Sequence, residues 1–258
     1  MDLDPAAEGA GPSAYPKTRA KVLPLWETEA RSGPKMEARA HLLEEAAIAF
    51  MERGFAATTL AYVAQRMGTT KGQIYHYYRS KSDLYFDVVV GAYFVVNDKT
   101  EQLAARTDLS PAERLHYMAV AHAQVIMKTW AWQRVALEAT QHQLLVGFTP
   151  REGRALARIT EFRDDYENRL SMIIAEGMEK GQFSPAPLVF ATKAALGSLN
   201  WLTVWYDPRK SSGSEAQDSI AHRIADFIIA GLSSSNLSFR DTARAALGLP
   251  GLQQPNGP

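Results

Sequence analysis

The sequence predicts an all-α protein that consists of a small three-helix head and a larger helical body. Apolar residues recur every three or four positions along most of the 258-residue chain, as they do on the buried face of a helix. We find neither the apolar–polar alternation of β-strands nor an internal repeat. Hydrophobic residues make up 46% of the chain, which is enough for a sizeable core.

The composition limits the classes of protein to which the chain can belong. Its 28 basic and 28 acidic residues balance, so the chain as a whole is no polycation. The absence of cysteine excludes disulfides, thiolate catalysis and cysteine-based zinc sites. No signal peptide is visible, and no apolar stretch approaches the ~20 residues that a membrane-spanning helix needs. We therefore expect a soluble cytoplasmic protein without a membrane partner.

Changes in composition divide the chain into four segments. Residues 1–32 are rich in Ala, Gly, Pro and acidic residues, which predicts a flexible N-terminal arm. Residues 33–82 form the predicted head and residues 83–235 the predicted body. Residues 236–258 are rich in Gly, Pro, Asn and Gln and are expected to form a flexible tail.

The first helix of the head is predicted to run from Pro34 to about Arg53, where Gly54 provides a C-terminal stop. We expect its apolar face to pack across the two helices that follow and so to complete the three-helix unit. That face consists of Leu43, Ala47, Phe50 and Met51.

The stretch Thr58–Asp83 predicts two short helices joined by a tight turn. Thr59 is a suitable N-cap for the first of them. Gly68 follows its apolar stripe, at a point where a left-handed cap causes a glycine no strain. The stripe consists of Leu60, Val63, Ala64 and Met67.

The second short helix is capped by Thr70, and only Ile74 and Tyr78 form its inward face. Tyrosines on a helix are often core residues, but here most of the surface carries groups that can touch a polyanion or a base edge. Residues 31–81 contain eight Lys/Arg against four Glu, so the head is basic and the rest of the chain acidic. This pattern is typical of the second helix of a helix-turn-helix. The outward residues are Lys71, Gly72, Gln73, Tyr75, His76 and Tyr77.

The stretch AATTLAYVAQRMGTTKGQIYHYYRSKSDL resembles the DNA-binding signature of the TetR family of repressors. That signature runs from a threonine pair through an apolar helix ending in Ala-x-x-x-Gly to Leu/Ile-Tyr-x-x-Phe/Tyr and a lysine. About thirty residues match in order and without a gap. The residues at the signature positions are Thr58, Thr59, Ala64, Gly68, Ile74, Tyr75, Tyr78 and Lys81.

The resemblance implies a head that binds double-stranded DNA, and side-chain chemistry suggests two kinds of contact. Lysine suits guanine and glutamine suits adenine, whereas phosphate contacts fix the register and carry no sequence code. The residues expected to read bases are Lys71, Gln73, Tyr77 and, through its backbone, Gly72; those expected to hold phosphates are Thr59, Thr70, Tyr75 and Lys81, with His76 suited to either role.

The body is predicted to be helical throughout. A helix from about Ser82 should leave the head and connect it to the body. Prolines then begin or break most of the later helices. These helices are expected at 111–128, 131–146, 150–181, 188–206 and 215–232.

The last two of these helices are more apolar than single-sided surface helices need to be. Such a surface usually marks a partner interface, and two helices from each of two subunits can form a four-helix interface. The resemblance implies the same homodimer, which would set two recognition helices on an inverted-repeat operator. The alternative is that these helices form only the core of a monomer.

A small-molecule site is expected in the body, between helices lined by aromatic residues. The stretch LGSLNWLTVWYDP (196–208) resembles a Gly-x-x-Asn-Trp-x-x-x-Trp-Tyr-x-Pro motif of TetR-like repressors of fatty-acid, sterol and related acyl-coenzyme A catabolism. The resemblance implies an acyl-CoA effector that releases DNA. Many relatives have a basic residue where this chain has Val204, so a hydrophobic or aromatic ligand without CoA is the alternative. The residues expected at the effector are Trp130, Phe162, Tyr166, Asn200, Trp201, Trp205 and Tyr206.

Two other functional classes compete with this interpretation. An enzyme is not expected, because the six histidines show no metal-ligand spacing and the chain has no phosphate loop or nucleophile elbow. Neither a metal nor a cofactor is expected. A helical adaptor that only binds other proteins would not need a basic, tyrosine-rich short helix. The sequence therefore predicts a ligand-responsive transcriptional repressor.

Overall fold

The computed structural model describes residues 34–141, 149–210 and 213–233. Every regular element in these ranges is a helix, which confirms the all-α prediction, and none of these helices is long and apolar enough to cross a membrane. The predicted arm (1–32) and tail (236–258) lie outside the described residues. The helices are α1 (Pro34–Ala57), α2 (Leu60–Arg66), α3 (Lys71–Tyr75), α4 (Lys81–Ala104), α5 (Pro111–Lys128), α6 (Trp130–Gln141), α7 (Pro150–Glu179), α8 (Leu188–Asn200), α9 (Leu202–Trp205) and α10 (Ser214–Ser233).

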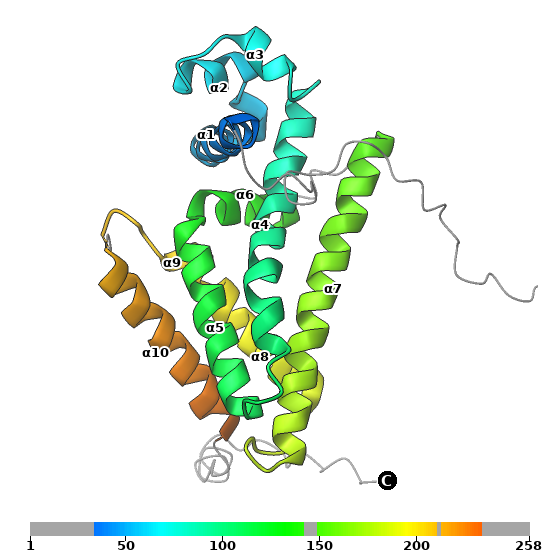
Figure 1. The fold of residues 1–258 in the computed structure, drawn as a ribbon, viewed down its shortest axis with the longest axis vertical. Helices are drawn as coiled ribbons and strands as arrows, with labels where there is room; N and C mark the ends of the chain where they lie inside the picture. The colour runs from blue at the N-terminus through cyan, green and yellow to red at the C-terminus, as the bar shows by residue number, and fades with distance from the viewer. Residues whose placement is uncertain (1–33, 142–148, 211–212, 234–258) are drawn as a thin grey trace, which may run out of the picture.

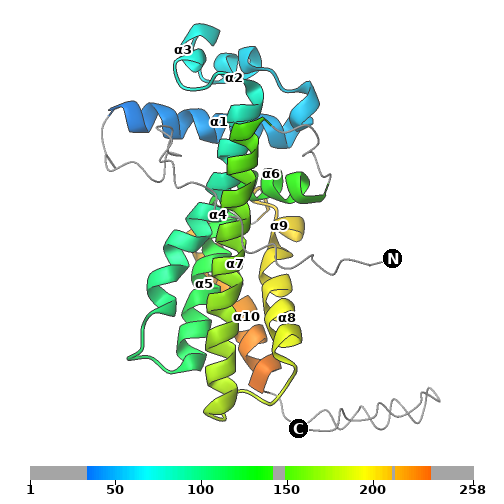
Figure 2. The same cartoon turned by 90° about the vertical axis from the view of Figure 1, so that its right-hand side faces the viewer.

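The head, α1–α3 with the first turns of α4, forms one end of an elongated molecule (Figures 1 and 2). α4 leaves the head and runs down the body beside α7 in both views. α5 lies along α4, and α10 packs mainly against α5. The short helix α6 lies across the top of the body, where it contacts α1 of the head.

The helix starts and the stop predicted in the head are confirmed. The hydroxyl of Thr59 accepts a hydrogen bond from the Tyr62 amide, and that of Thr70 accepts one from the Gln73 amide. Both bonds satisfy backbone donors that the first turn of a helix leaves unpaired. Gly54, at φ 72°, interrupts α1 where the sequence predicts its end.

α4 connects two hydrophobic cores. Leu84, Val88 and Ala92 are buried in the core that α4 shares with α1–α3, α6 and the first half of α7. Val96 is buried in the second core, with α5, α8 and α10. A rotation or shift of α4 would therefore disturb the packing of the head and of the body together.

Two helices predicted from the sequence differ from those in the structure. The helix predicted at 131–146 is described from Trp130 to Gln141, and residues 142–148 lie outside the described residues. The single helix predicted at 188–206 is divided into α8 and α9 at Trp201. There the Val204 amide donates to the carbonyl of Trp201, three residues back, at 2.9 Å. This spacing is that of a 3₁₀-helix, so the chain winds more tightly here than in an α-helix.

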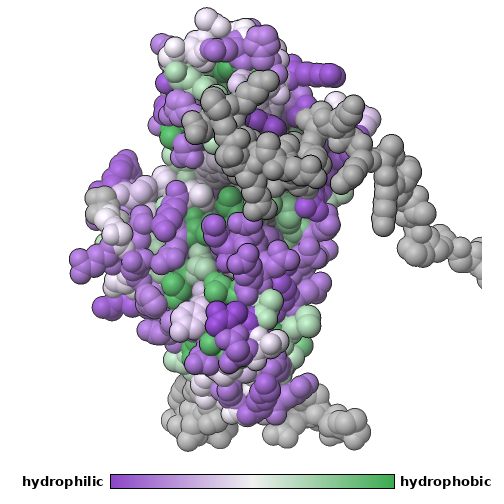
Figure 3. Space-filling view, viewed as in Figure 1, coloured by the Kyte–Doolittle hydropathy of each residue, from purple (hydrophilic) through white to green (hydrophobic). Residues whose placement is uncertain are grey.

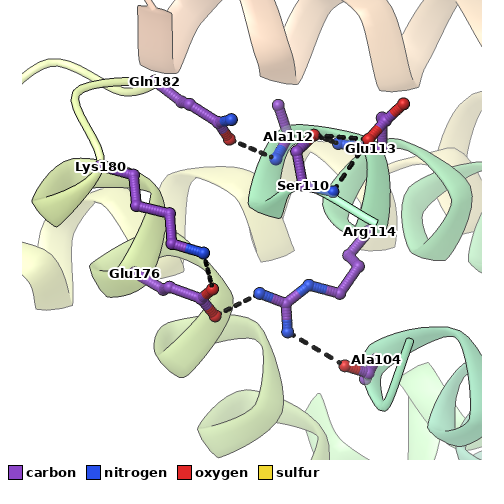
Figure 4. A network of polar contacts seen from close by, with 8 residues as sticks. All are labelled: Ala104, Ser110, Ala112, Glu113, Arg114, Glu176, Lys180 and Gln182. Carbon is purple, nitrogen blue, oxygen red and sulfur yellow. Dashed lines mark hydrogen bonds and ion pairs between the residues drawn. The ribbon is translucent and has the colours of Figure 1, made fainter. Parts of the chain in front are cut away.

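A polar network joins α5 and α7 at the end of the body away from the head (Figure 4). The guanidinium of Arg114 donates to a carboxylate oxygen of Glu176 and, at 3.4 Å, to the carbonyl of Ala104. Lys180 and Arg114 together hold the pKa of Glu176 below its usual range. Because the Arg114 side chain is only 7% exposed, these partners compensate a charge that water cannot solvate.

The end of α7 makes a prediction about stability. A Cβ on Gly177 would overlap the ring of Phe183, which is fully buried and folds back over this glycine. We expect Gly177→Ala to lower the free energy of unfolding by about 1–3 kcal/mol, because an overpacked core must shift to make room. Urea denaturation followed by circular dichroism measures the change.

Gly153 provides the matched control on the same helix. No atom lies within 4 Å of a Cβ placed there, so Gly153→Ala should leave stability unchanged or raise it by up to about 1 kcal/mol. Equal effects of the two alanines would contradict the packing described for Phe183.

Candidate functional site

The outer face of α3 is exposed and carries several kinds of polar and aromatic group. Lys71, Gly72, Gln73, Tyr75 and His76 are all exposed, and the Tyr75 ring is 48% exposed. The Lys71 ammonium lies 5.6 Å from the centre of that ring. The five-residue helix thus presents donors, an aromatic ring and a positive charge together, as the sequence predicts; Tyr77 is only partly exposed.

α3 is held in place from its inner side by two buried residues, as predicted. Ile74 is 1% exposed and Tyr78 is fully buried. The Tyr78 hydroxyl accepts a hydrogen bond from Nε of Arg39 at 3.3 Å, and Arg39 also binds Asp87 of α4 at 3.0 Å. Burial, and then the nearby Asp87 charge, raise the pKa of Tyr78, so the phenol stays protonated. One polar cluster therefore ties α3 to both α1 and α4.

The two threonines of the signature have different roles in the structure. Thr58 is buried, and its hydroxyl donates to the carbonyls of Ala49 at 3.0 Å and Gly54 at 2.8 Å. It fixes the turn between α1 and α2. Thr59 is exposed at the start of α2, where its free hydroxyl hydrogen and the helix N-terminus can meet a phosphate.

Lys81 lies in a different environment from the one expected of a phosphate contact. Its ammonium donates to the carbonyls of Phe55 at 2.7 Å and Ala56 at 3.1 Å, and it lies 4.4 Å from the centre of the Phe55 ring. These bonds join the start of α4 to the end of α1. Lys81 therefore holds the start of α4 against the end of α1, and any phosphate contact would be additional to this role.

The body contains a central cavity of about 220 Å³ between α4, α5, α6, α7, α8 and α9. Its lining combines apolar side chains with neutral polar groups, which is typical of a small-molecule site. Three charged residues, Arg163, Glu167 and Lys193, lie at its edge, and Lys193 forms an ion pair with Glu167 at 2.6 Å. The neutral polar residues are Tyr93, Asn97, His122, Gln133, Thr140, Tyr166, Asn200 and Thr203.

His122 and Tyr166 form the most buried polar pair of the cavity. Nδ1 of His122 and the Tyr166 hydroxyl lie 2.6 Å apart and share a hydrogen bond. Burial lowers the pKa of His122 to about 4, an effect that a hydrogen bond with Asn200 only partly opposes. The imidazole is therefore neutral at physiological pH and presents one donor and one acceptor.

A second buried link ties the cavity wall together. Nδ2 of Asn97 donates to the carbonyls of Tyr93 at 3.1 Å and Phe162 at 3.0 Å, and its oxygen accepts from Arg169. The bonds with Phe162 and Arg169 cross from α4 to α7. Asn97 thus fixes the separation of the two helices that enclose the cavity.

The residues expected at the effector are divided among three places. Phe162, Tyr166 and Asn200 line the central cavity. Trp130 and Tyr206 line a cleft between the head and the body. Trp201 is 62% exposed and lines a shallow groove on α8–α10, and Trp205 borders both that groove and the cleft.

Sequence reasoning missed several polar residues of the cavity. Asn97 and Gln133 belong to no motif and Thr203 occupies an unspecified position of the motif at 196–208, and the three meet only because α4, α6 and α9 pack together. His122 carried one signal, because it lies in the buried stripe of α5 between apolar neighbours. Among the described residues, no cluster of His, Asp and Glu could hold a metal ion.

An apolar strip covers the outer side of α8–α10. Phe190 and Val189 are each 72% exposed, Phe227 71% and Trp205 50%. On the face drawn in Figure 3, hydrophobic patches also lie among hydrophilic ones along the body. Large apolar side chains exposed to this degree are typical of a protein–protein interface.

Comparison with known proteins assigns both parts of the chain. The family described as bacterial regulatory proteins, tetR family, matches residues 42–88, and the tetracyclin repressor-like C-terminal domain matches residues 108–232. The transcriptional repressor KstR2 of Rhodococcus jostii is 23% identical over 212 residues, which cover 82% of this chain and 97% of the relative.

Solved structures share the fold. The ketosteroid transcriptional regulator KstR2 of Mycobacterium tuberculosis is 22% identical and has a TM-score of 0.66, with 77% of this chain and 96% of that chain covered. AibR, solved in complex with isovaleryl coenzyme A and operator DNA, is 20% identical with a TM-score of 0.57, and 75% and 96% of the two chains are covered.

The neutral state of His122 makes a prediction about the pH dependence of stability. Because folding lowers its pKa from 6.5 to about 4, the unfolded chain binds more protons between these values, and the free energy of unfolding rises with pH there. The variant His122→Gln retains a polar side chain that does not titrate. Urea denaturation of both proteins measures the contribution of His122 as a difference.

On acidification from neutral pH to about pH 4, the native protein should lose up to about 3 kcal/mol relative to the variant. A difference that is the same at every pH would mean that His122 titrates normally. That result would contradict the burial of the hydrogen bond between His122 and Tyr166.

Proposed function

The chain belongs to the TetR family of bacterial regulatory proteins, and from this premise we propose that it is a dimeric repressor that an effector releases from an inverted-repeat operator. The observation that carries the proposal is the pairing of two features in one chain. A short helix with an exposed polar face is anchored on one end of α4, and a cavity with polar lining lies beside the other half of the same helix.

DNA would be read by α3 in the major groove. Its exposed Lys71 and Gln73 suit guanine and adenine, and Tyr75 and Thr59 are placed to hold phosphates. Arg79, exposed directly after α3, supplies a further positive charge close to the DNA. The anchors Ile74 and Tyr78 keep this surface rigid, so that its contacts need little ordering when they form.

The dimer would form through the apolar strip of α8–α10. Next to Phe227, the groove lined by Trp201, Trp205 and Ile224 is a place where a partner's side chain can insert. An isologous interface of this kind is self-complementary and positions two heads for two half-sites of one operator. The alternative of a helical adaptor would use the same strip without a DNA contact.

The effector we propose is an acyl-CoA thioester whose acyl part enters the central cavity. AibR was solved with isovaleryl coenzyme A, and KstR2 is described as a ketosteroid regulator, so acyl or steroid-like groups are the first candidates. The Tyr166 hydroxyl, which the neutral His122 orients, can bond a carbonyl or hydroxyl inside the cavity. Arg163 at the edge suits an anionic group of such a ligand, whereas Lys193 is already paired with Glu167. An uncharged hydrophobic or aromatic compound remains the alternative.

Coupling between the two sites would pass through α4 and α6. α6 contributes Gln133 to the cavity, and its Trp132 donates a hydrogen bond to Glu44 of α1 at 2.7 Å. A ligand that displaces α6 would move this contact, and with it the head. A typical coupling free energy of ~1–3 kcal/mol would change operator affinity about 5–150-fold.

Base readout by α3 can be tested with Lys71→Ala. The variant should lose about 1–3 kcal/mol of binding free energy on the operator and much less on random DNA, because it removes a base contact. Fluorescence anisotropy with labelled DNA from the region upstream of the gene measures both. Lys99→Ala, which removes a body lysine that is 66% exposed, should change neither. An equal loss of binding free energy on the operator and on random DNA would mean that Lys71 contacts phosphates and not bases.

The whole proposal is tested by adding acyl-CoA thioesters to the protein–operator complex. One member of a panel that includes isovaleryl-CoA should lower the anisotropy. Leu196→Trp, which fills the cavity, should bind the operator normally but resist release, whereas Leu196→Met should behave as the native protein does. Release of Leu196→Trp by the same thioester would place the effector elsewhere. If no thioester disturbs operator binding, the acyl-CoA effector is ruled out, and the proposal that the chain is a repressor stands.

A further inference from the structure

A second hollow lies between α1 of the head and the body, and we call it the head–body cleft. It has a volume of about 820 Å³, within the range of small-molecule sites, and it opens to solvent. One wall is α1; the other is formed by the end of α5, the start of α6 and residues 204–210. α6 separates the cleft from the central cavity, since Arg134 lines the cleft and Gln133 and Leu137 line the cavity.

The acidic groups of the cleft all have partners. A carboxylate in an ion pair repels an incoming anion less than a free one does, because its positive partner offsets its charge. Glu52 pairs in this way with Arg66 at 3.0 Å and Asp207 with Arg209 at 3.0 Å, whereas Glu44 accepts a hydrogen bond from the neutral indole N–H of Trp132 at 2.7 Å and keeps its charge.

The two basic groups that α5 and α6 contribute to the cleft have no such partner. Lys128 ends α5 and Arg134 lies one turn into α6, and both line the cleft. Within the described residues, neither makes a hydrogen bond or an ion pair. The lining of the cleft has four basic residues (Lys128, Arg134, Arg209 and Lys210) against three acidic ones (Glu44, Glu52 and Asp207), so its formal net charge is positive.

The remaining lining suits a flat ring. The Trp205 side chain is half exposed. The indole N–H of Trp130 already donates to the carbonyl of Thr203 at 3.3 Å. A ligand in the cleft would therefore contact the ring of Trp130 and not its N–H group. Ile48 and Met51 of α1 form an apolar patch on the opposite wall. Aromatic rings beside basic groups bind phosphate esters of heterocyclic bases by stacking and by charge.

From this arrangement we propose that the head–body cleft is a second ligand site and that it binds a phosphorylated purine nucleotide. Lys128 and Arg134 hold the phosphates, and the base stacks on an indole of the cleft. The ligand touches α1 on one side and α5 and α6 on the other, so it bridges the head and the body.

Two sources share this chemistry. One is a free nucleotide; the other is the nucleotide end of a CoA thioester whose acyl part occupies the cavity across α6. Lys128 and Arg134, which line the cleft, supply the positive charge that either source requires. Only the second source rests on the function proposed above; the site itself does not.

The test is isothermal titration of the full chain, without DNA, with ADP in one series and coenzyme A in another. We expect saturable binding of at least one probe. The double variant K128A/R134A should weaken it by about tenfold or more, because it removes two charge-assisted contacts. The pair K128Q/R134Q, which keeps the side chains long and polar, should do the same. Circular dichroism establishes that each variant is folded.

The matched control is K99A/R154A, which removes one lysine and one arginine from exposed places on α4 and α7 outside the cleft. It should bind as the native protein does. Binding of ADP supports a free nucleotide, and binding of coenzyme A alone with the same charge dependence supports the thioester. No binding of either probe, or equal affinity of native protein and K128A/R134A, overturns the site. Since no operator is present, these results are independent of whether the chain represses.

Discussion

The constraint on which the rest of the structure depends is the burial of α4 in two cores at once. Its first half packs with α1–α3 and α6, and its second half packs with α5 and α7. A helix buried on so many sides cannot shift at one end alone, because close-packed side chains transmit displacement and do not absorb it. The polar cluster of Arg39, Tyr78 and Asp87 fixes α3 to the same helix. A DNA-reading surface and a ligand cavity on one rigid element can therefore influence each other.

α6 completes this arrangement, because it borders the cavity on one side and the head–body cleft on the other. It is linked to α1 by apolar packing in a shared core and by the hydrogen bond between Trp132 and Glu44. The cavity itself is lined mostly by neutral groups, and the buried His122 remains uncharged. The charged groups lie at its edge and in the cleft. This division suits a ligand with an apolar, weakly polar part and an anionic part.

The sequence predicted the head more fully than the body, and the reason is physical. Capping by Thr59 and Thr70 and the burial of Ile74 and Tyr78 follow from local spacing, which a single sequence contains. The cavity depends on where six helices meet, which spacing does not encode. The motif at 196–208 led to Asn200, but the break of the helix at Trp201 places that indole on the surface. Lys81 shows the same limit: a lysine suited to phosphate binds two carbonyls of the head.

The central claim is that the effector site and the operator site are coupled through α4 and α6. The most direct measurement is the affinity of a releasing thioester for the protein alone and for the protein saturated with operator, by isothermal titration. Coupling free energies are reciprocal, so the operator should weaken thioester binding by the same factor, about 5–150-fold, by which the thioester weakens operator binding. Equal thioester affinity with and without operator would contradict the account, because two uncoupled sites cannot regulate each other.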